Sequence, residues 1–168
     1  MSATYEPIAT TTASGSANSI TFSSISSAYT DLVLIANGQV ATAANMYLQF
    51  GNGSIDTGSN YSDTRLIAEG VGSPSSSRAS SATYIRLDGY AFWRTSYSAM
   101  NIIQIQNYSN TTTNKTALIR SGNGSGGVDA IVGLWRSTSA INTIKFGTIG
   151  GANISSGSTF TLYGIKAE

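Results

Sequence analysis

Hydrophobic and polar residues alternate along several short segments of the chain. Met46, Leu48 and Phe50 fall on one face of residues 45–50, and Phe160 and Leu162 fall on one face of residues 159–163. Successive side chains of a strand point to opposite sides of a sheet, so this alternation predicts strands with one buried and one solvated face. The same pattern places Ile85 and Leu87 inward and Arg86 and Asp88 outward, and puts Val128, Ala130, Val132 and Leu134 on one shared face.

Turn-forming residues separate these segments, and no long stretch shows the 3.6-residue period of a helix. The other strand candidates are residues 19–25, 31–36, 64–68, 100–106, 115–120 and 141–146. Short connectors predict two antiparallel hairpins, one from 100–106 with 115–120 and one from 128–136 with 141–146. About nine strands with turns between them predict an all-β, single-domain antiparallel β-sandwich of jelly-roll type, with an immunoglobulin-like sandwich as the second choice.

Two regions do not show the alternation. Residues 70–81 have the composition of a loop, and residues 1–18 are rich in Ser, Thr and Ala. We therefore expect an N-terminal arm over 1–18 ahead of a β-sandwich domain over 19–168. Because such an arm is mobile unless something holds it, our hypothesis is that it lies against a neighbouring subunit or a partner. Its candidate assembly contacts are Tyr5, Pro7 and Ile8.

The composition argues against most catalytic chemistry. The chain has no His and no Cys, and its 9 Lys and Arg nearly balance 8 Asp and Glu. It cannot form a Ser–His or Cys–His pair, and zinc, copper or haem would find almost no ligands. We therefore expect a protein that is not an enzyme and uses no cofactor. Nucleic acid and membrane are not expected partners, because no basic patch and no long apolar run is present. Residues 1–18 lack the pattern of a signal peptide, which predicts folding in a cytoplasm.

Carboxylates are the remaining candidates for chemistry. Asp56 and Asp63 flank a segment rich in oxygen ligands, but its spacing does not match a calcium loop. A turn with local side-chain hydrogen bonds is the favoured interpretation of 56–63, and a calcium site is the alternative. A glycosidase needs two carboxylates facing each other across a cleft. The sequence does not show whether any two of Asp31, Asp63, Asp88 and Asp129 are placed in this way.

An aromatic run at residues 90–97 is the main candidate for a binding surface. It contains Tyr90, Phe92, Trp93, Arg94 and Tyr97 and does not alternate cleanly. Exposed aromatic residues with Arg are typical of protein interfaces and of sugar-stacking surfaces. The alternative is a loop that folds back over the core. Trp135 lies within a strong strand pattern, and we expect it to be packed.

Several phrases along the chain together carry a family resemblance. They are YEPIATTT at 5–12, ITFSSI at 20–25, YTDLVL at 29–34, DTGSNYS at 56–62, QNYSNTTT at 106–113, IVGLWR at 131–136 and GSTFTLYGIK at 157–166. This series resembles small virion structural proteins of tailed bacteriophages, especially those of aquatic bacteria such as cyanobacteria. The resemblance covers nearly the whole chain in order, except for residues 71–97.

The resemblance implies a virion component outside the major capsid shell, assembled in the host cytoplasm. One role is that of a capsid decoration or cement protein, a jelly roll that binds the major capsid protein and stabilises the head. The alternative is a tail-fibre or receptor-binding tip that recognises a host surface glycan. The chain has no heptads or repeats that would form a fibre shaft, which favours decoration. We expect a homotrimer, which would match local three-fold positions on a shell.

Overall fold

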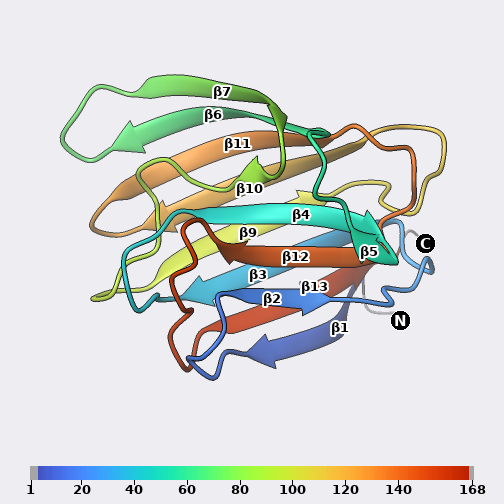
Figure 1. Ribbon diagram of the computed structural model, residues 1–168, viewed down its shortest axis with the longest axis horizontal. Helices are drawn as coiled ribbons and strands as arrows, with labels where there is room; N and C mark the ends of the chain where they lie inside the picture. Colours follow the sequence, from blue (N-terminus) through green and yellow to red (C-terminus); the bar gives the residue numbers. More distant parts are fainter. Residues whose placement is uncertain (1–3, 167–168) are drawn as a thin grey trace.

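The computed structural model describes residues 4–166 and contains thirteen strands and no helix within that range (Figure 1). The strands are β1 (Tyr5–Thr12), β2 (Ser19–Phe22), β3 (Asp31–Gly38), β4 (Met46–Asn52), β5 (Ser54–Ile55), β6 (Tyr61–Glu69), β7 (Ser75–Ala82), β8 (Ile85–Arg86), β9 (Ala99–Ile105), β10 (Lys115–Asn123), β11 (Gly127–Trp135), β12 (Thr143–Thr148) and β13 (Thr159–Ile165). Within 4–166, therefore, no helix is available to span a membrane.

The strands form two antiparallel sheets packed face to face. The large sheet has eight strands in the order β1-β13-β3-β9-β10-β11-β6-β7, and the small sheet has the order β2-β12-β4-β5 with β8 paired to β4. Strands from the two ends of the chain pair with each other, as β1 does with β13 and β2 with β12. The two antiparallel sheets thus form a sandwich that resembles a jelly roll. The expected all-β sandwich of this type is confirmed.

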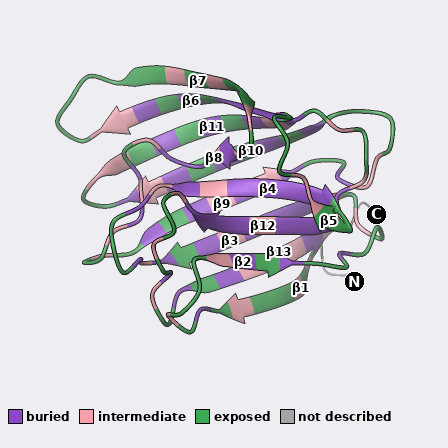
Figure 2. Cartoon of the chain, viewed as in Figure 1, coloured by how far each residue is buried: buried purple, intermediate pink, exposed green. Residues whose placement is uncertain are grey.

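The core lies between the two sheets (Figure 2). Met46, Leu48 and Phe50 on β4 are fully buried, as predicted from the alternation, and so are Phe160 and Leu162 on β13. The rings of Phe160 from the large sheet and Phe146 from the small sheet meet edge to face, with centroids 5.3 Å apart. Aromatic contacts of this kind join the sheets across the core.

The predicted connections are confirmed in one case and wrong in the other. Residues 100–106 and 115–120 form the hairpin β9–β10, in which Ile103 lies opposite Ile119. The second expected hairpin does not exist, because β11 pairs with β10 and β6 whereas β12 belongs to the small sheet. The short connector 136–142 crosses from one sheet to the other. The hairpin partner of β11 is β10, joined through the glycine-rich turn at 124–126.

Two segments expected outside the sheets are strands. Residues 75–81, expected to be part of a loop, belong to edge strand β7, which is paired with β6. Residues 5–12, expected to be part of an arm, form edge strand β1 paired with β13 of the same chain. Tyr5 packs edge to face on Tyr163 with ring centroids 6.2 Å apart, and Ile8 packs against the core. The assignment of 5–12 to an arm separate from the sandwich is therefore wrong. Residues 1–3 lie outside the described residues.

Candidate functional site

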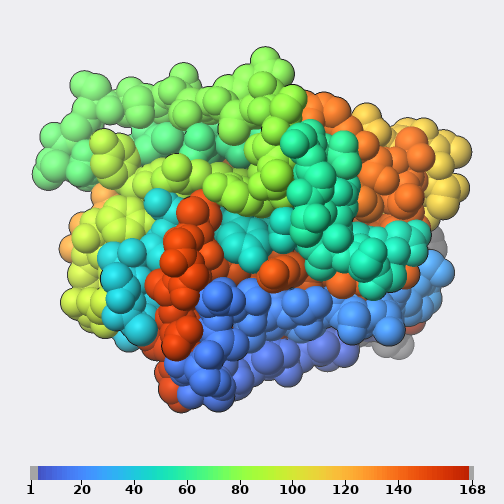
Figure 3. All heavy atoms as spheres, in the orientation of Figure 1, coloured from blue at the N-terminus to red at the C-terminus, as the bar shows by residue number. Residues whose placement is uncertain are grey.

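Exposed hydrophobic side chains gather on the outer face of the large sheet. Five of them lie there, with exposed fractions of 57% for Leu66, 43% for Met100, 42% for Leu118, 63% for Val128 and 47% for Val132. These side chains come from the adjacent strands β6, β9, β10 and β11 and point away from the small sheet. Figure 3 shows the molecule from the side on which the small sheet lies, so the outer face of the large sheet is turned away from the viewer.

The register of the strands makes these residues one continuous surface. Leu118 lies opposite Val132, and Arg120 lies between Ala130 and Ile102 on the neighbouring strands. Ala130 in turn lies opposite Leu66. We call the five exposed hydrophobic residues, together with Arg120 and Ala130, the outer-face patch. Contiguous exposed apolar surface of this kind is typical of protein interaction sites.

Arg120 stands between two shallow depressions in the patch. One, of about 310 Å³, is bordered by Leu66, Val128 and Ala130, and the other, of about 290 Å³, by Leu118, Ala130 and Val132. Arg120 and Ala130 border both depressions. The alanine side chain is short and leaves this part of the surface unfilled. Arg120 is the only charged residue among the seven that define the patch, and Asp129, which also borders the first depression, is buried. The patch therefore offers apolar hollows on either side of one cation.

The apolar set predicted on one face of β11 points outward, away from the core. Val128, Ala130, Val132 and Leu134 do share one face, but this is the outer face, and Ile131 and Trp135 point into the core. Both faces of β11 carry apolar residues, so alternation alone does not identify the inward set. Trp135 is packed, as expected, with its ring 6.0 Å from that of Phe50 between centroids.

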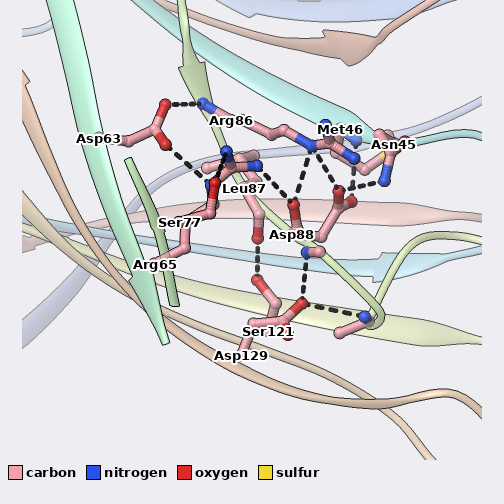
Figure 4. Close-up of polar contacts among 12 residues, drawn as sticks. Asn45, Met46, Asp63, Arg65, Ser77, Arg86, Leu87, Asp88, Ser121 and Asp129 are labelled. Atoms are coloured by element: carbon pink, nitrogen blue, oxygen red, sulfur yellow. Dashed lines mark hydrogen bonds and ion pairs between the residues drawn. The ribbon is translucent and has the colours of Figure 1, made fainter. Parts of the chain in front are cut away.

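The buried carboxylates hold the backbone of residues 85–91 in place (Figure 4). Asp88 accepts hydrogen bonds from the backbone N–H of Met46 at 2.9 Å and from the Asn45 side chain at 2.7 Å. It is fully buried, so the expectation that it points outward is wrong. Burial raises the pKa of Asp88 to about 7, against the opposing effect of these hydrogen bonds. On β11, Asp129 accepts from the backbone N–H of Gly89 at 2.6 Å and of Ala91 at 2.9 Å.

The other two carboxylates considered for catalysis also accept backbone N–H groups. Asp63 pairs with Arg65 at 2.9 Å and accepts from the backbone of Arg86 at 3.2 Å. Asp31 accepts from the backbone of Asn107 at 2.7 Å. Each of the four carboxylates thus binds different backbone N–H groups. This arrangement positions loops and strands.

Asp56 forms the local hydrogen bonds expected of a turn. Its Oδ1 accepts from the backbone N–H of Gly58 at 2.8 Å, and its Oδ2 accepts from the side chains of Asn60 at 2.8 Å and Trp135 at 2.7 Å. Burial opposes these hydrogen bonds, but together they hold the pKa of Asp56 below its ordinary value. Among residues 4–166 no group of three or more acidic side chains is placed to hold a metal ion.

The residues of the aromatic run lie in different environments. Trp93 is fully buried, stacks on Phe160 at a centroid distance of 5.9 Å, and donates its Nε1–H to Asn101 Oδ1 at 2.7 Å. For Trp93, folding back over the core is therefore the correct alternative. Tyr90 is 40% exposed. Phe92, Arg94 and Tyr97 are partly buried and lie near the surface, with the Arg94 guanidinium 4.1 Å from the centre of the Phe92 ring and 5.8 Å from that of Tyr97.

The outer-face patch was not predicted from the sequence. Its signal was present in residues 115–120 and 128–135, where apolar residues occupy both alternating sets. In a protein of two sheets, only the inner face of each sheet packs on the other sheet. A strand that is apolar on both faces therefore has an apolar outer face that a partner can cover. Arg120 gave no such signal, because its position in the patch depends on the strand order.

Comparisons with known proteins identify no family. No family model matches the chain, and no curated protein matches it. Among solved structures, a tetrameric galectin from the sponge Cinachyrella sp. has a TM-score of 0.37 at 10% identity, covering 88% of this chain and 99% of that one. The Caenorhabditis elegans galectin LEC-6 has a TM-score of 0.38 at 10% identity, with coverages of 90% and 94%. Alginate lyase Aly36B has a TM-score of 0.37 at 13% identity, with coverages of 88% and 78%. These similarities carry no functional argument.

Proposed function

We propose that this protein is a structural component of a tailed-bacteriophage virion, a decoration protein that binds the outside of the head and stabilises it. The observation that carries the proposal is the outer-face patch. A decoration protein acts through contacts alone, and an apolar surface with one central cation supplies such contacts. The resemblance of the sequence to small virion proteins supports the same role.

The patch favours a particular kind of contact with the major capsid protein. Covering Leu118, Val128 and their neighbours removes apolar surface from water. This contributes a favourable free energy of about 25 cal/mol for each Å² that is buried. Arg120 would be left without a partner in a purely apolar interface, and an unpaired buried charge is costly. The complementary surface on the coat protein therefore presents a carboxylate to Arg120, with apolar side chains on both sides. In this proposal the chain is not an enzyme and needs no cofactor, nucleic acid or membrane.

The proposed assembly is a homotrimer. Closed symmetry is the general rule for homo-oligomers, and three-fold symmetry would match local three-fold positions on a shell. Light scattering at micromolar concentration measures the mass directly. A monomer under these conditions would count against the trimer while leaving the location on the virion open.

Locating the protein on the virion tests the function itself. Cryo-EM of particles, with an antibody or gold label on this chain, is expected to show regular density over the head. Density confined to the tail tip would overturn the decoration role.

The second candidate is a receptor-binding tip that recognises a host surface glycan. One observation favours it, a pocket lined by Arg94 at one end of the large sheet. Label at the tail tip together with sugar binding in this pocket would support this role.

A further inference from the structure

A pocket of about 480 Å³ lies at one end of the large sheet, away from the outer-face patch's centre. Its walls come from residues 68–71 at the end of β6, from the β10–β11 turn at 123–127, and from Arg94. Figure 1 shows the β6–β7 connection and the β10–β11 turn at the same end of the sandwich. The volume falls within the range of about 300–1,000 Å³ that is typical of small-molecule sites.

The β10–β11 turn is held in one conformation by its own hydrogen bonds. Asn123 accepts the backbone N–H of Ser125 at 3.0 Å and donates to the backbone carbonyl of Phe92 at 2.8 Å. A Cβ at Gly126 would lie 2.7 Å from the Tyr90 carbonyl oxygen, and one at Gly127 would lie 2.3 Å from that of Ala68. Only glycine permits these close approaches, so the wall of the pocket is packed directly on the 90–92 segment and on β6.

Two opposite charges line the pocket without pairing to each other. The ion pairs found among residues 4–166 are Asp63–Arg65, Arg86–Asp88 and Glu6–Lys166, and neither Arg94 nor Glu69 is among them. The Arg94 guanidinium lies over the Phe92 ring, 4.1 Å from the ring centre. Its Nε is buried and has no hydrogen-bond partner. Arg94 and Glu69 therefore both border the pocket, and neither takes part in one of these ion pairs.

The rest of the lining consists of small or apolar residues, glycine backbone and the polar residues Asn123 and Ser125. Val71 is 95% exposed and Val128 is 63% exposed, and both border the pocket. Gly124, Gly126 and Gly127 add main chain with no side chains to fill the space. The pocket thus combines short apolar walls with a few polar groups that both donate and accept hydrogen bonds.

We infer that this pocket binds one unit of a neutral saccharide. A sugar ring presents hydroxyl groups, which accept from Arg94 and donate to Glu69, and a C–H face, which packs on Val71 and Val128. A single anion is not favoured, because Glu69 offsets the charge of Arg94. This inference deepens the second candidate function, the glycan-recognising tip, and does not depend on the capsid role.

An NMR titration tests the inference directly. The ¹⁵N-labelled full chain is titrated with methyl glucoside, methyl galactoside, N-acetylglucosamine and, as an anionic probe, glucuronate. We expect saturable shifts of the Gly124, Gly126 and Gly127 amide signals with at least one neutral sugar. Arg94→Gln and Glu69→Gln are each expected to weaken that binding about tenfold, the effect of losing one hydrogen bond to a charged group. The matched control is Arg78→Gln, which removes an exposed arginine on β7 outside the pocket.

Three results would overturn the inference. The first is no saturable shift with any neutral sugar, and the second is binding of glucuronate alone. The third is neutral-sugar binding that neither Gln variant weakens. Signal dispersion in the same spectra shows whether a variant is folded, and Glu69→Gln at the end of β6 leaves the Phe92–Arg94 packing intact. Sugar binding and location on the virion are separate measurements, so either proposal can fail without the other.

Discussion

The indole Nε1–H of Trp135 is donated to Asp56 Oδ2 at 2.7 Å, which ties the end of β11 to the loop after β5. Asp56 thereby connects its own turn to a strand of the large sheet that is distant in sequence.

Replacing Asp56 by Ala is expected to lower the free energy of unfolding by about 2–3 kcal/mol, because the change leaves the Trp135 N–H without its charged acceptor. Urea unfolding followed by tryptophan fluorescence measures the loss. Thr57→Ala in the same loop is the control, since Thr57 is exposed. An equal loss in both variants would contradict the role of the Asp56 hydrogen bonds.

Asp88 is expected to make stability fall as pH rises. Its pKa is raised from 3.8 to about 7 by burial, so the folded state holds a proton that the unfolded state releases. Between these two pKa values this group lowers the unfolding free energy by up to about 1.4 kcal/mol per pH unit. Asp88→Asn is expected to remove this decline, as measured by urea unfolding from pH 4 to pH 8.

Asp56 provides a comparison of opposite sign. Because its pKa is lowered in the fold, its contribution is present above the unfolded value of 3.8 and is lost as pH falls through the folded value. Asp56→Asn should therefore change stability at the acid end, whereas Asp88→Asn changes it between about pH 4 and pH 7. The same pH profile for the wild type and Asp88→Asn would show that Asp88 is not the titrating group.

Trp93 is expected to act in stability and not in surface binding. Trp93→Ala removes a fully buried ring and should cost about 3–5 kcal/mol. Trp93→Phe keeps most of the packing but leaves the Asn101 oxygen without its donor, which should cost about 1–3 kcal/mol. Thermal unfolding ranks the two variants. If Trp93→Ala were as stable as the wild type, the buried position of the ring would be wrong.

Leu118→Glu in the outer-face patch is expected to abolish binding to the head with little effect on folding. An exposed position of this kind changes stability by only about 0.5 kcal/mol, whereas a carboxylate in a covered apolar interface is strongly unfavourable. Co-sedimentation of the purified variant with heads that lack this protein measures the binding. Arg120→Glu should also weaken it, through charge reversal at the centre of the patch.

The control for these variants is Thr10→Glu, which adds the same charge to the edge strand β1, outside the patch. If Thr10→Glu weakens binding as much as Leu118→Glu, the patch is not the contact surface.

The sequence was informative where one face of a strand is apolar and the other polar. Residues 46–50 on β4 and 160–162 on β13 are such cases, and their inward sets are as predicted. Strand β11 carries apolar residues on both faces, so the sequence does not show which face points inward. In the fold, the inward face is the one that carries Trp135. Strand β7 is rich in Ser and has no apolar face at all. It is a strand because β6 supplies its hydrogen-bond partners, which composition does not reveal.

The candidate site was harder to predict from the sequence than the strands, because its residues come together only in the tertiary structure. Asp88 follows the alternating pattern of an outward residue, yet it is buried, because Asn45 and the Met46 backbone approach it from a distant part of the chain. Arg94 was among the predicted binding residues. Its pocket also needs Glu69 and the 123–127 turn, which only the strand order brings to it.

The two edges of the large sheet have a consequence for the solubility of the protein. β1 carries Pro7 and a register shift between Pro7 and Ala9, and β7 carries Arg78 and a register shift opposite Tyr61 and Asp63. Proline, charge and irregular pairing all hinder the addition of another strand to a sheet edge. At high concentration, copies of the large sheet are therefore hindered from joining edge to edge into fibres.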